Sequence, residues 1–182
     1  MYDVLDYGKC CDLVLFEFFN AFNMVDYFLL FKKLANLHLS DALFNIKYCF
    51  LCNRKQKVKI KNTYSTFLPN TSGVPQGTVL ARKLFLIFLN DLITSPFINR
   101  ISAFADNLKL LGLSGDKLQA DINFIYKWIL ENKLSINEIK CVVNNFGKNN
   151  SHTNYFLGSI QLVCETAAKD FGVFVDVNLC FN

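Results

Sequence analysis

The stretch ISAFADNLKL, residues 101–110, places an Asp-Asn pair between two short apolar runs. Both residues favour tight turns, because they tolerate left-handed backbone angles and can bond their own backbone. We therefore expect a β-hairpin with arms at residues 101–105 and 108–111 and with Asp106 and Asn107 at its tip. Turn chemistry alone would explain the pair, and a functional acid at the tip is the alternative.

The composition predicts one domain with a real core, because the chain has 182 residues of which 52% are hydrophobic and 19% charged. We expect this single domain to span residues 1–182. No apolar run reaches the ~20 residues of a membrane helix, and the start lacks a basic segment followed by an apolar one. We therefore expect no membrane partner and an intracellular location, in the nucleus or the cytoplasm.

Seven cysteines, an odd number, are scattered along the chain and suit a reducing compartment rather than a disulfide framework. Cys49 and Cys52 have the C-x-x-C spacing, and His38 lies upstream. A structural zinc site needs four ligands, however, and no second pair follows. We expect buried thiols on a helix instead.

The spacing of apolar residues predicts an alternation of strands and helices. Helical patterns cover residues 25–39, 41–52 with Asp41 as N-cap, 78–92 with Thr78 as N-cap, and 116–134. Strand patterns cover residues 12–18, 56–67 as a two-strand ribbon around Asn62, 141–146, 155–163 and 171–177. Loops are expected at residues 68–77 and, on the surface, at residues 148–154. This order predicts an α+β fold in which helices cover one face of an antiparallel sheet.

A basic stripe is predicted on the ribbon. Lys57, Lys59 and Lys61 alternate with apolar residues and so share one face of a strand, with Arg54 and Lys55 at its entry. Lysines on an edge strand can simply prevent unwanted pairing with other chains. A stripe that faces nucleic-acid phosphates explains the pattern equally well.

Two acids fall at the ends of predicted strands, Glu17 after the first strand and Asp106 at the hairpin tip. If these strands are neighbours, both carboxylates reach one edge of the sheet, where they repel unless a cation lies between them. Carboxylates of this kind bind Mg²⁺, and Mn²⁺ also, and two such ions can activate an attacking oxygen and stabilise a leaving one. The sequence thus predicts a metal site for nucleotidyl transfer.

A resemblance to a known family rests on six segments in a shared order: LVLFEFFNAFNMVDYFLLFKKL, CNRKQKVKIKN, SGVPQGTVL with LFLIFLNDL, ISAFADNLKL, LSINEIKCVVNNFGK and KDFGVFVD. Together they resemble the reverse transcriptase of non-LTR, LINE-type retrotransposons, along nearly the whole chain. The resemblance implies a polymerase palm with part of the fingers and an RNA-directed DNA polymerase activity. It also implies an RNA template, a DNA primer and deoxynucleoside triphosphates as partners.

The catalytic positions of that family match Glu17, Asp106 and Asn107. The family carries Asp at all three, so this chain departs from the pattern at two of them. Lys140 matches a lysine considered to protonate the leaving pyrophosphate, and an ordinary surface lysine is the alternative.

The nucleotide-binding positions match Phe22, with its neighbour Ala21, and the loop residues Gln76 and Gly77. In the family the aromatic residue lies under the sugar of the incoming nucleotide, whereas a core Phe is the alternative here. Gln76 and Gly77 match residues that line the nucleotide pocket and the template, and a plain loop is the alternative. Residues 169–176, with residues 155–163 before them, resemble the hairpin that grips the primer end.

Some family features are expected to be missing, namely the N-terminal fingers, an endonuclease domain and the thumb. Ala81, Arg82 and Lys83 also place two charges at the start of a helix that should be buried. Three hypotheses follow: a degenerate palm with little or no catalysis, a palm completed by other segments or chains, and a non-catalytic RNA- or DNA-binding module.

Overall fold

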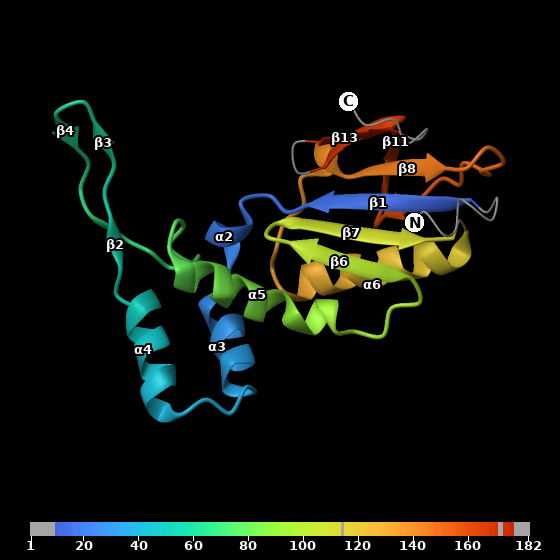
Figure 1. Ribbon diagram of the computed structural model, residues 1–182. Helices are drawn as coiled ribbons and strands as arrows, with labels where there is room; N and C mark the ends of the chain where they lie inside the picture. The colour runs from blue at the N-terminus through green and yellow to red at the C-terminus, as the bar shows by residue number, and fades with distance from the viewer. Residues whose placement is uncertain (1–9, 114, 171–172, 177–182) are drawn as a thin grey trace. The chain divides into compact units, whose positions relative to one another are not determined.

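The computed structural model describes residues 10–113, 115–170 and 173–176 (Figure 1). The chain forms two compact units, one made of the residues up to Phe19 together with those from Leu92 onward, and the other made of Asn20–Asp91. No helix in the described part of the chain is long and apolar enough to cross a membrane.

The first unit contains a five-stranded sheet. Its strands, in spatial order, are β11 (Val163–Cys164), β8 (Val142–Phe146), β1 (Cys11–Glu17), β7 (Asn107–Gly112) and β6 (Arg100–Phe104). All neighbouring strands are antiparallel except β11 and β8, which are parallel. The sheet confirms the predicted α+β class and its antiparallel character.

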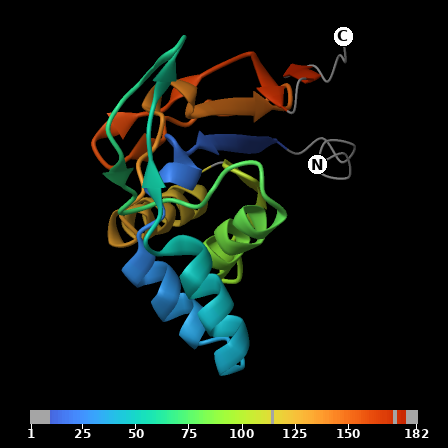
Figure 2. The ribbon, with the colours of Figure 1, turned by 90° about the vertical axis from the view of Figure 1, so that its left-hand side faces the viewer.

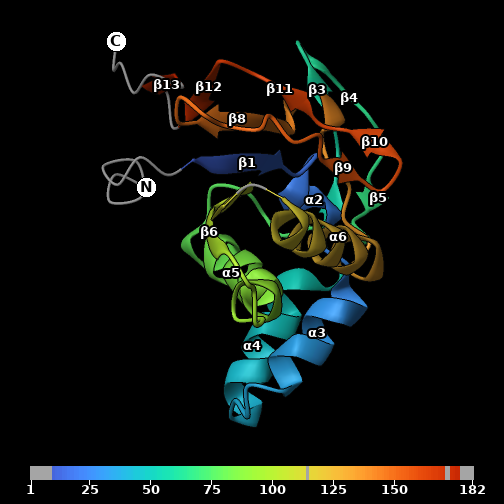
Figure 3. The same cartoon turned by 90° about the vertical axis from the view of Figure 1, so that its right-hand side faces the viewer.

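Helix α6 (Asp116–Glu131) contacts β7 and lies against one face of this sheet (Figure 3). Its buried apolar side chains recur at helical spacing and include Leu118, Ile122, Ile125, Trp128 and Ile129. Leu130, the next apolar residue of the helix, is exposed. One helical step of about 100° separates it from Ile129, and this step is enough to turn the side chain away from the core.

The predicted strand at residues 155–163 is interrupted by a tight turn. β9 (Phe156–Leu157) and β10 (Ile160–Gln161) form a small hairpin, and Gly158 between them has a positive φ of 63°. A glycine adopts this backbone angle without strain, which explains why the strand breaks there. The expected hairpin near the end is present as β12 (Ala167–Asp170) and β13 (Val173–Asp176), whereas residues 171, 172 and 177 lie outside the described residues.

The predicted surface loop at residues 148–154 is partly buried, contrary to expectation. Asn150 lies in the core, and its Nδ2 donates to Asp12 Oδ1 over 2.7 Å. The same oxygen accepts from Asn145 Nδ2 at 2.8 Å, and Asp12 Oδ2 accepts from the Tyr155 hydroxyl at 2.6 Å. The wholly buried Asp12 therefore holds this loop through hydrogen bonds that no local pattern reveals.

The second unit contains the helices α2 (Ala21–Met24), α3 (Tyr27–Ala35), α4 (Asp41–Leu51) and most of α5 (Val79–Ile93). α3 and α4 contact each other and lie side by side (Figure 2). Thr78 caps α5 as predicted, because its Oγ1 accepts from Ala81 N at 3.2 Å. The N-cap position of α4 is Ser40, and the predicted cap Asp41 is the first helical residue.

Two expectations about these helices were wrong. Arg82 and Lys83 are exposed, because α5 buries only one stripe, which includes Leu84, Phe88 and Leu92. Their charges therefore cost no desolvation. The thiols at the end of α4 are not buried either, since Cys49 is exposed and Cys52 is half-buried.

The predicted ribbon is present as two paired segments. β2 (Lys55–Gln56) pairs with β5 (Leu68–Pro69), and β3 (Lys59–Ile60) pairs with β4 (Thr63–Tyr64). Its tip is formed by residues 61 and 62, in agreement with the sequence, and Lys61 has a left-handed φ of 53°. Lys61 thus lies in the turn rather than on the strand face where it was predicted.

Candidate functional site

The end of β1 and the β6–β7 hairpin meet in the sheet. Glu17 is directly opposite Asn107 in the antiparallel register, and Phe18 N donates to Asp106 O at 3.1 Å. The residues that match the family's three acids therefore lie next to one another in the sheet, although they come from distant parts of the chain.

The hairpin turn lies one residue earlier than predicted. Asn107 is the first residue of β7 and pairs with Phe104, which leaves Ala105 and Asp106 as the two turn residues. Ala105 takes the left-handed angle, with φ at 52°. The Asp-Asn pair is thus divided between the turn and the strand, and Asn107 has a fixed position opposite Glu17.

Glu17 and Asn107 lie on the less buried face of the sheet. Along β1 the burial alternates, so that Val14 and Phe16 are fully buried while Leu15 and Glu17 are partly exposed. Residues directly opposite each other in an antiparallel pair share a face. A ligand could therefore approach Glu17 and Asn107 from the same side.

Lys140 forms an ion pair with Glu17. Its Nζ donates to Glu17 Oε1 at 2.5 Å, with 56% of the lysine side chain and 28% of the glutamate side chain exposed. The short 3-10 helix Glu138–Lys140 brings the lysine there, and Asn137 N donates to Glu17 O at 2.8 Å just before it. The predicted proton donor is thus bound to the predicted metal ligand.

The residues present do not fit a site for two Mg²⁺ ions. Among residues 10–113, 115–170 and 173–176, no three His, Cys, Asp or Glu side chains cluster so that they could hold a metal ion. The Glu17 carboxylate already has the Lys140 ammonium as its counter-ion, and Asn107 supplies a neutral amide. Only Asp106 remains as an acid of the expected type.

The predicted nucleotide positions lie in the second unit, where α2 is tied to the loop before α5. Phe22 O accepts from Val74 N at 2.8 Å, and Val25 O accepts from Gly73 N at 2.9 Å. Gly73 has φ at 81°, and a Cβ there would come within 2.8 Å of Asn23 Cα. The loop can approach α2 this closely because the residue is glycine.

Phe22 is half-buried and stacks on Phe85, with 4.6 Å between the ring centroids. Ala21, the first residue of α2, is buried. Gln76 and Gly77 are exposed in the turn before α5. The structure therefore joins Phe22 to the loop that carries Gln76 and Gly77, whereas Glu17, Asp106, Asn107 and Lys140 belong to the first unit.

The predicted basic residues divide into two kinds. Arg54 Nη2 donates to Tyr27 Oη and to Gly73 O, each at 2.7 Å, and Nε donates to Leu51 O at 3.1 Å. This guanidinium therefore links the base of the ribbon to Tyr27 and to the loop at Gly73, and its assignment to the nucleic-acid set stays a prediction. The four lysines at positions 55, 57, 59 and 61 are exposed.

Two aromatic residues were missed in the sequence. Lys57 Nζ lies 4.1 Å from the ring centroid of Tyr64 and 5.0 Å from that of Phe67, and Lys59 Nζ lies 5.4 Å from the Tyr64 ring. The sequence does place aromatic residues on one arm of the ribbon and lysines on the other. Which of them lie opposite each other can be told only when the strand register is known.

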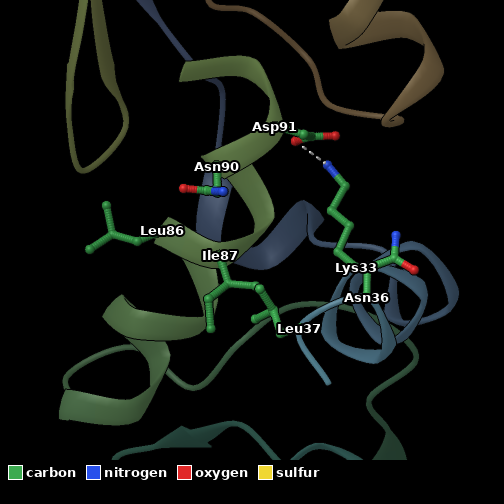
Figure 4. A pocket seen from close by; sticks show the side chains of 7 residues that line it. All are labelled: Lys33, Asn36, Leu37, Leu86, Ile87, Asn90 and Asp91. Carbon is green, nitrogen blue, oxygen red and sulfur yellow. Dashed lines mark hydrogen bonds and ion pairs between the residues drawn. The ribbon is translucent and has the colours of Figure 1, made fainter. Parts of the chain in front are cut away.

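A hollow of about 350 Å³ lies between α3 and α5 in the second unit (Figure 4). Its lining consists of Lys33, Asn36, Leu37, Leu86, Ile87, Asn90 and Asp91. Lys33 Nζ donates to Asp91 Oδ1 at 2.8 Å and to Phe88 O at 2.7 Å. Burial lowers the pKa of Lys33, and the hydrogen bond to Asp91 opposes that shift. None of the predicted site residues lines this hollow.

Comparison with known proteins gives one family and one fold. The profile described as "Reverse transcriptase (RNA-dependent DNA polymerase)" matches residues 4–161. No curated protein sequence matches the chain. Apo telomerase from Candida tropicalis, truncated from the C-terminal domain, aligns with a TM-score of 0.67 and 14% identity over 100% of this chain and 37% of its own.

Two further telomerase structures, both in complex with a TWJ fragment of telomeric RNA, are similar. The Candida tropicalis complex has a TM-score of 0.69 at 14% identity, over 100% of this chain and 31% of its own. The Candida albicans complex has a TM-score of 0.66 at 13% identity, over 98% of this chain and 32% of its own. This chain thus spans about a third of those telomerase chains, and the likeness concerns the fold. Because the family profile covers most of the sequence, the chain belongs to the reverse transcriptase family.

Proposed function

We propose that this chain is the palm of a LINE-type, non-LTR retroelement reverse transcriptase in which nucleotidyl transfer is impaired. The order of its motifs, with SGVPQG before ISAFADN, supports the LINE-type origin. The observation that carries the impairment is the ion pair between Lys140 and Glu17 directly beside Asn107.

The charge at this site supports the impairment. A site that holds two divalent cations needs several carboxylates, and Mg²⁺ tolerates little deviation from octahedral geometry. Here Glu17 is longer than Asp by one methylene and is already neutralised, while Asn107 contributes no charge. Each 1.36 kcal/mol of lost transition-state stabilisation lowers the rate about tenfold, so a weakened site costs several powers of ten.

The proposed partners are an RNA template, a DNA primer and deoxynucleoside triphosphates. The similar Candida tropicalis telomerase is described in complex with a fragment of telomeric RNA, which supports an RNA partner for this fold. In this proposal the triphosphate lies near Phe22 and the loop with Gln76 and Gly77, because the hydrogen bonds of Gly73 and Val74 fix that loop on α2.

Primer extension on an RNA template, with Mg²⁺ and with Mn²⁺, tests the proposal. The unmodified chain, Asn107→Asp, and the double variant Glu17→Asp/Asn107→Asp are compared. We expect extension from the double variant only, and Asp106→Asn added to it as a control should abolish the signal. Efficient extension by the unmodified chain would refute the impairment, and no extension by any variant would refute an intact palm.

A further inference from the structure

The segment between Asp41 and Asp91 is charged with one sign only. It contains no Asp or Glu, whereas it contains eight basic residues: Lys47, Arg54, Lys55, Lys57, Lys59, Lys61, Arg82 and Lys83. The ribbon concentrates these charges, and all of its residues from 55 to 69 are exposed. Such a surface attracts a polyanion, because no acid within the segment offsets the lysines.

One face of the ribbon combines lysines with open aromatic rings. Lys59 is paired with Tyr64 across the hairpin, so their side chains share a face. Lys57 Nζ lies over both the Tyr64 and the Phe67 ring, which connects Phe67 to the same face. Tyr64 is 51% exposed and Phe67 is 61% exposed. We call the set Lys57, Lys59, Tyr64 and Phe67 the ribbon face.

We propose that the ribbon face binds single-stranded nucleic acid, with bases stacked on Tyr64 and Phe67 and phosphates contacted by Lys57 and Lys59. Base–aromatic stacking is tolerant of sequence, and lysines beside the rings follow the backbone between stacked bases. A base that stacks on Tyr64 displaces the Lys57 ammonium from the ring. The displacement costs little, because a cation–π interaction at an exposed site is weak, and the lysine binds a phosphate in exchange.

The aromatic rings distinguish this site from an edge protected by lysines. Lysines alone discourage association, but two large exposed rings on the same face favour it, so the protective explanation does not account for Tyr64 and Phe67. The partner is single-stranded, because the bases of a duplex are stacked on one another and present no open face to a ring. This site lies outside the residues proposed for nucleotide transfer, and it adds to that proposal a separate surface for a single strand.

Fluorescence anisotropy with a labelled RNA or DNA strand of about twelve nucleotides tests the stacking. We expect Tyr64→Ala/Phe67→Ala to weaken binding about tenfold or more at unchanged protein charge. The matched control is Val58→Ala/Ile60→Ala, which alters exposed residues on the other face of the same ribbon and should bind like the parent. Circular dichroism establishes that both variants are folded.

The charge contribution is tested by the salt dependence of binding. Lys57→Gln/Lys59→Gln should reduce the slope of log K against log salt by about 1.4, whereas Arg82→Gln/Lys83→Gln, which removes two exposed charges outside the ribbon, should leave it nearly unchanged. An abasic strand should bind the parent no better than the natural strand binds the double alanine variant.

The proposal is overturned if the parent binds no strand, binds abasic and natural strands equally, or binds a blunt duplex more tightly than a single strand. It is also overturned if anionic phospholipid vesicles bind the parent as tightly as the single strand does and bind the double alanine variant equally well. Glu17, Asp106 and Asn107 are unchanged in all of these variants. A failure here therefore leaves the polymerase proposal intact, and the primer-extension result does not decide this one.

Discussion

Asp12 and Glu17 lie near opposite ends of β1 and, because side chains alternate along a strand, they face opposite sides of the sheet. Asp12 is wholly buried and accepts hydrogen bonds from Asn145, Asn150 and Tyr155. Glu17 is partly exposed and has a single ammonium as its partner. The same strand thus carries one carboxylate that fixes the structure and one that remains accessible to a ligand.

The physical difference is the cost of leaving a partner unsatisfied. The Asp12 side chain is wholly buried, so water does not readily replace a hydrogen bond that is broken there. Around Glu17 water can solvate either member of the ion pair, and the pair contributes little to folding. For folding, an acid in the first environment is therefore costlier to replace than an acid in the second.

The largest expected effect is that of Asp12→Ala, which removes an acceptor from each of three donors, on Asn145, Asn150 and Tyr155. We expect a loss of roughly 3–5 kcal/mol in the free energy of unfolding, measured by chemical denaturation. Glu17→Gln should lose no more than about 1 kcal/mol in the same experiment. Equal losses for the two variants would show that the contrast between the ends of β1 is wrong.

Asn150→Ala sharpens the contrast within the loop of residues 148–154. Its side chain donates to Asp12 Oδ1 and also to Phe146 O at 3.1 Å, so its removal should cost about 1–3 kcal/mol. The matched control is Asn149→Ala, one residue earlier and exposed, which should stay within about 0.5 kcal/mol of the parent. If both variants unfold alike, the loop is an ordinary surface loop after all.

Tyr155 makes the buried end of β1 sensitive to alkali. Burial raises the pKa of its hydroxyl, and the hydrogen bond to Asp12 raises it further. The protonated Tyr155 hydroxyl therefore contributes its full stabilisation of the folded state below the ordinary tyrosine pKa of about 10. This contribution is lost as the pH rises from there towards the folded-state pKa.

Tyr155→Phe should accordingly cost about 1–3 kcal/mol near neutral pH and flatten the fall in unfolding free energy above about pH 10. The measurement is chemical denaturation across pH, with the exposed Tyr64→Phe as control. A parallel fall for parent and Tyr155→Phe would exclude this hydroxyl as the source.

Sequence reasoning succeeded where the information was local. The helix α5 with its Thr78 cap, the strand β1 and the ribbon around Asn62 were all predicted, because propensity and capping act over a few residues. The adjacency of β1 and the β6–β7 hairpin was stated only as a condition for the metal site, and the pairing of β1 with β7 confirms it. The hairpin turn was misplaced by one residue, because Ala105 adopts a left-handed backbone angle that Asp and Asn adopt more readily than Ala.

Long-range pairs explain what was missed. Asp12 and Asn150 are 138 positions apart, and Glu17 and Lys140 are 123 positions apart. No periodicity links such residues, so the burial of Asn150 and the ion pair of Glu17 are visible only in the folded chain. Tyr64 likewise became part of a surface only when the hairpin register placed it beside Lys59.

The smallest expected effect on stability belongs to Lys140→Gln, at the exposed end of the strand. It should change the free energy of unfolding by less than about 1 kcal/mol, and the change should shrink as salt is added, because exposed ion pairs are screened. In an Asn107→Asp background the same substitution releases Glu17 from its counter-ion. Mn²⁺ binding measured by water-proton relaxation should then strengthen relative to Asn107→Asp alone. If Mn²⁺ binding weakens instead, the ammonium supports the metal site. The idea that Lys140 neutralises Glu17 as a metal ligand would then be wrong.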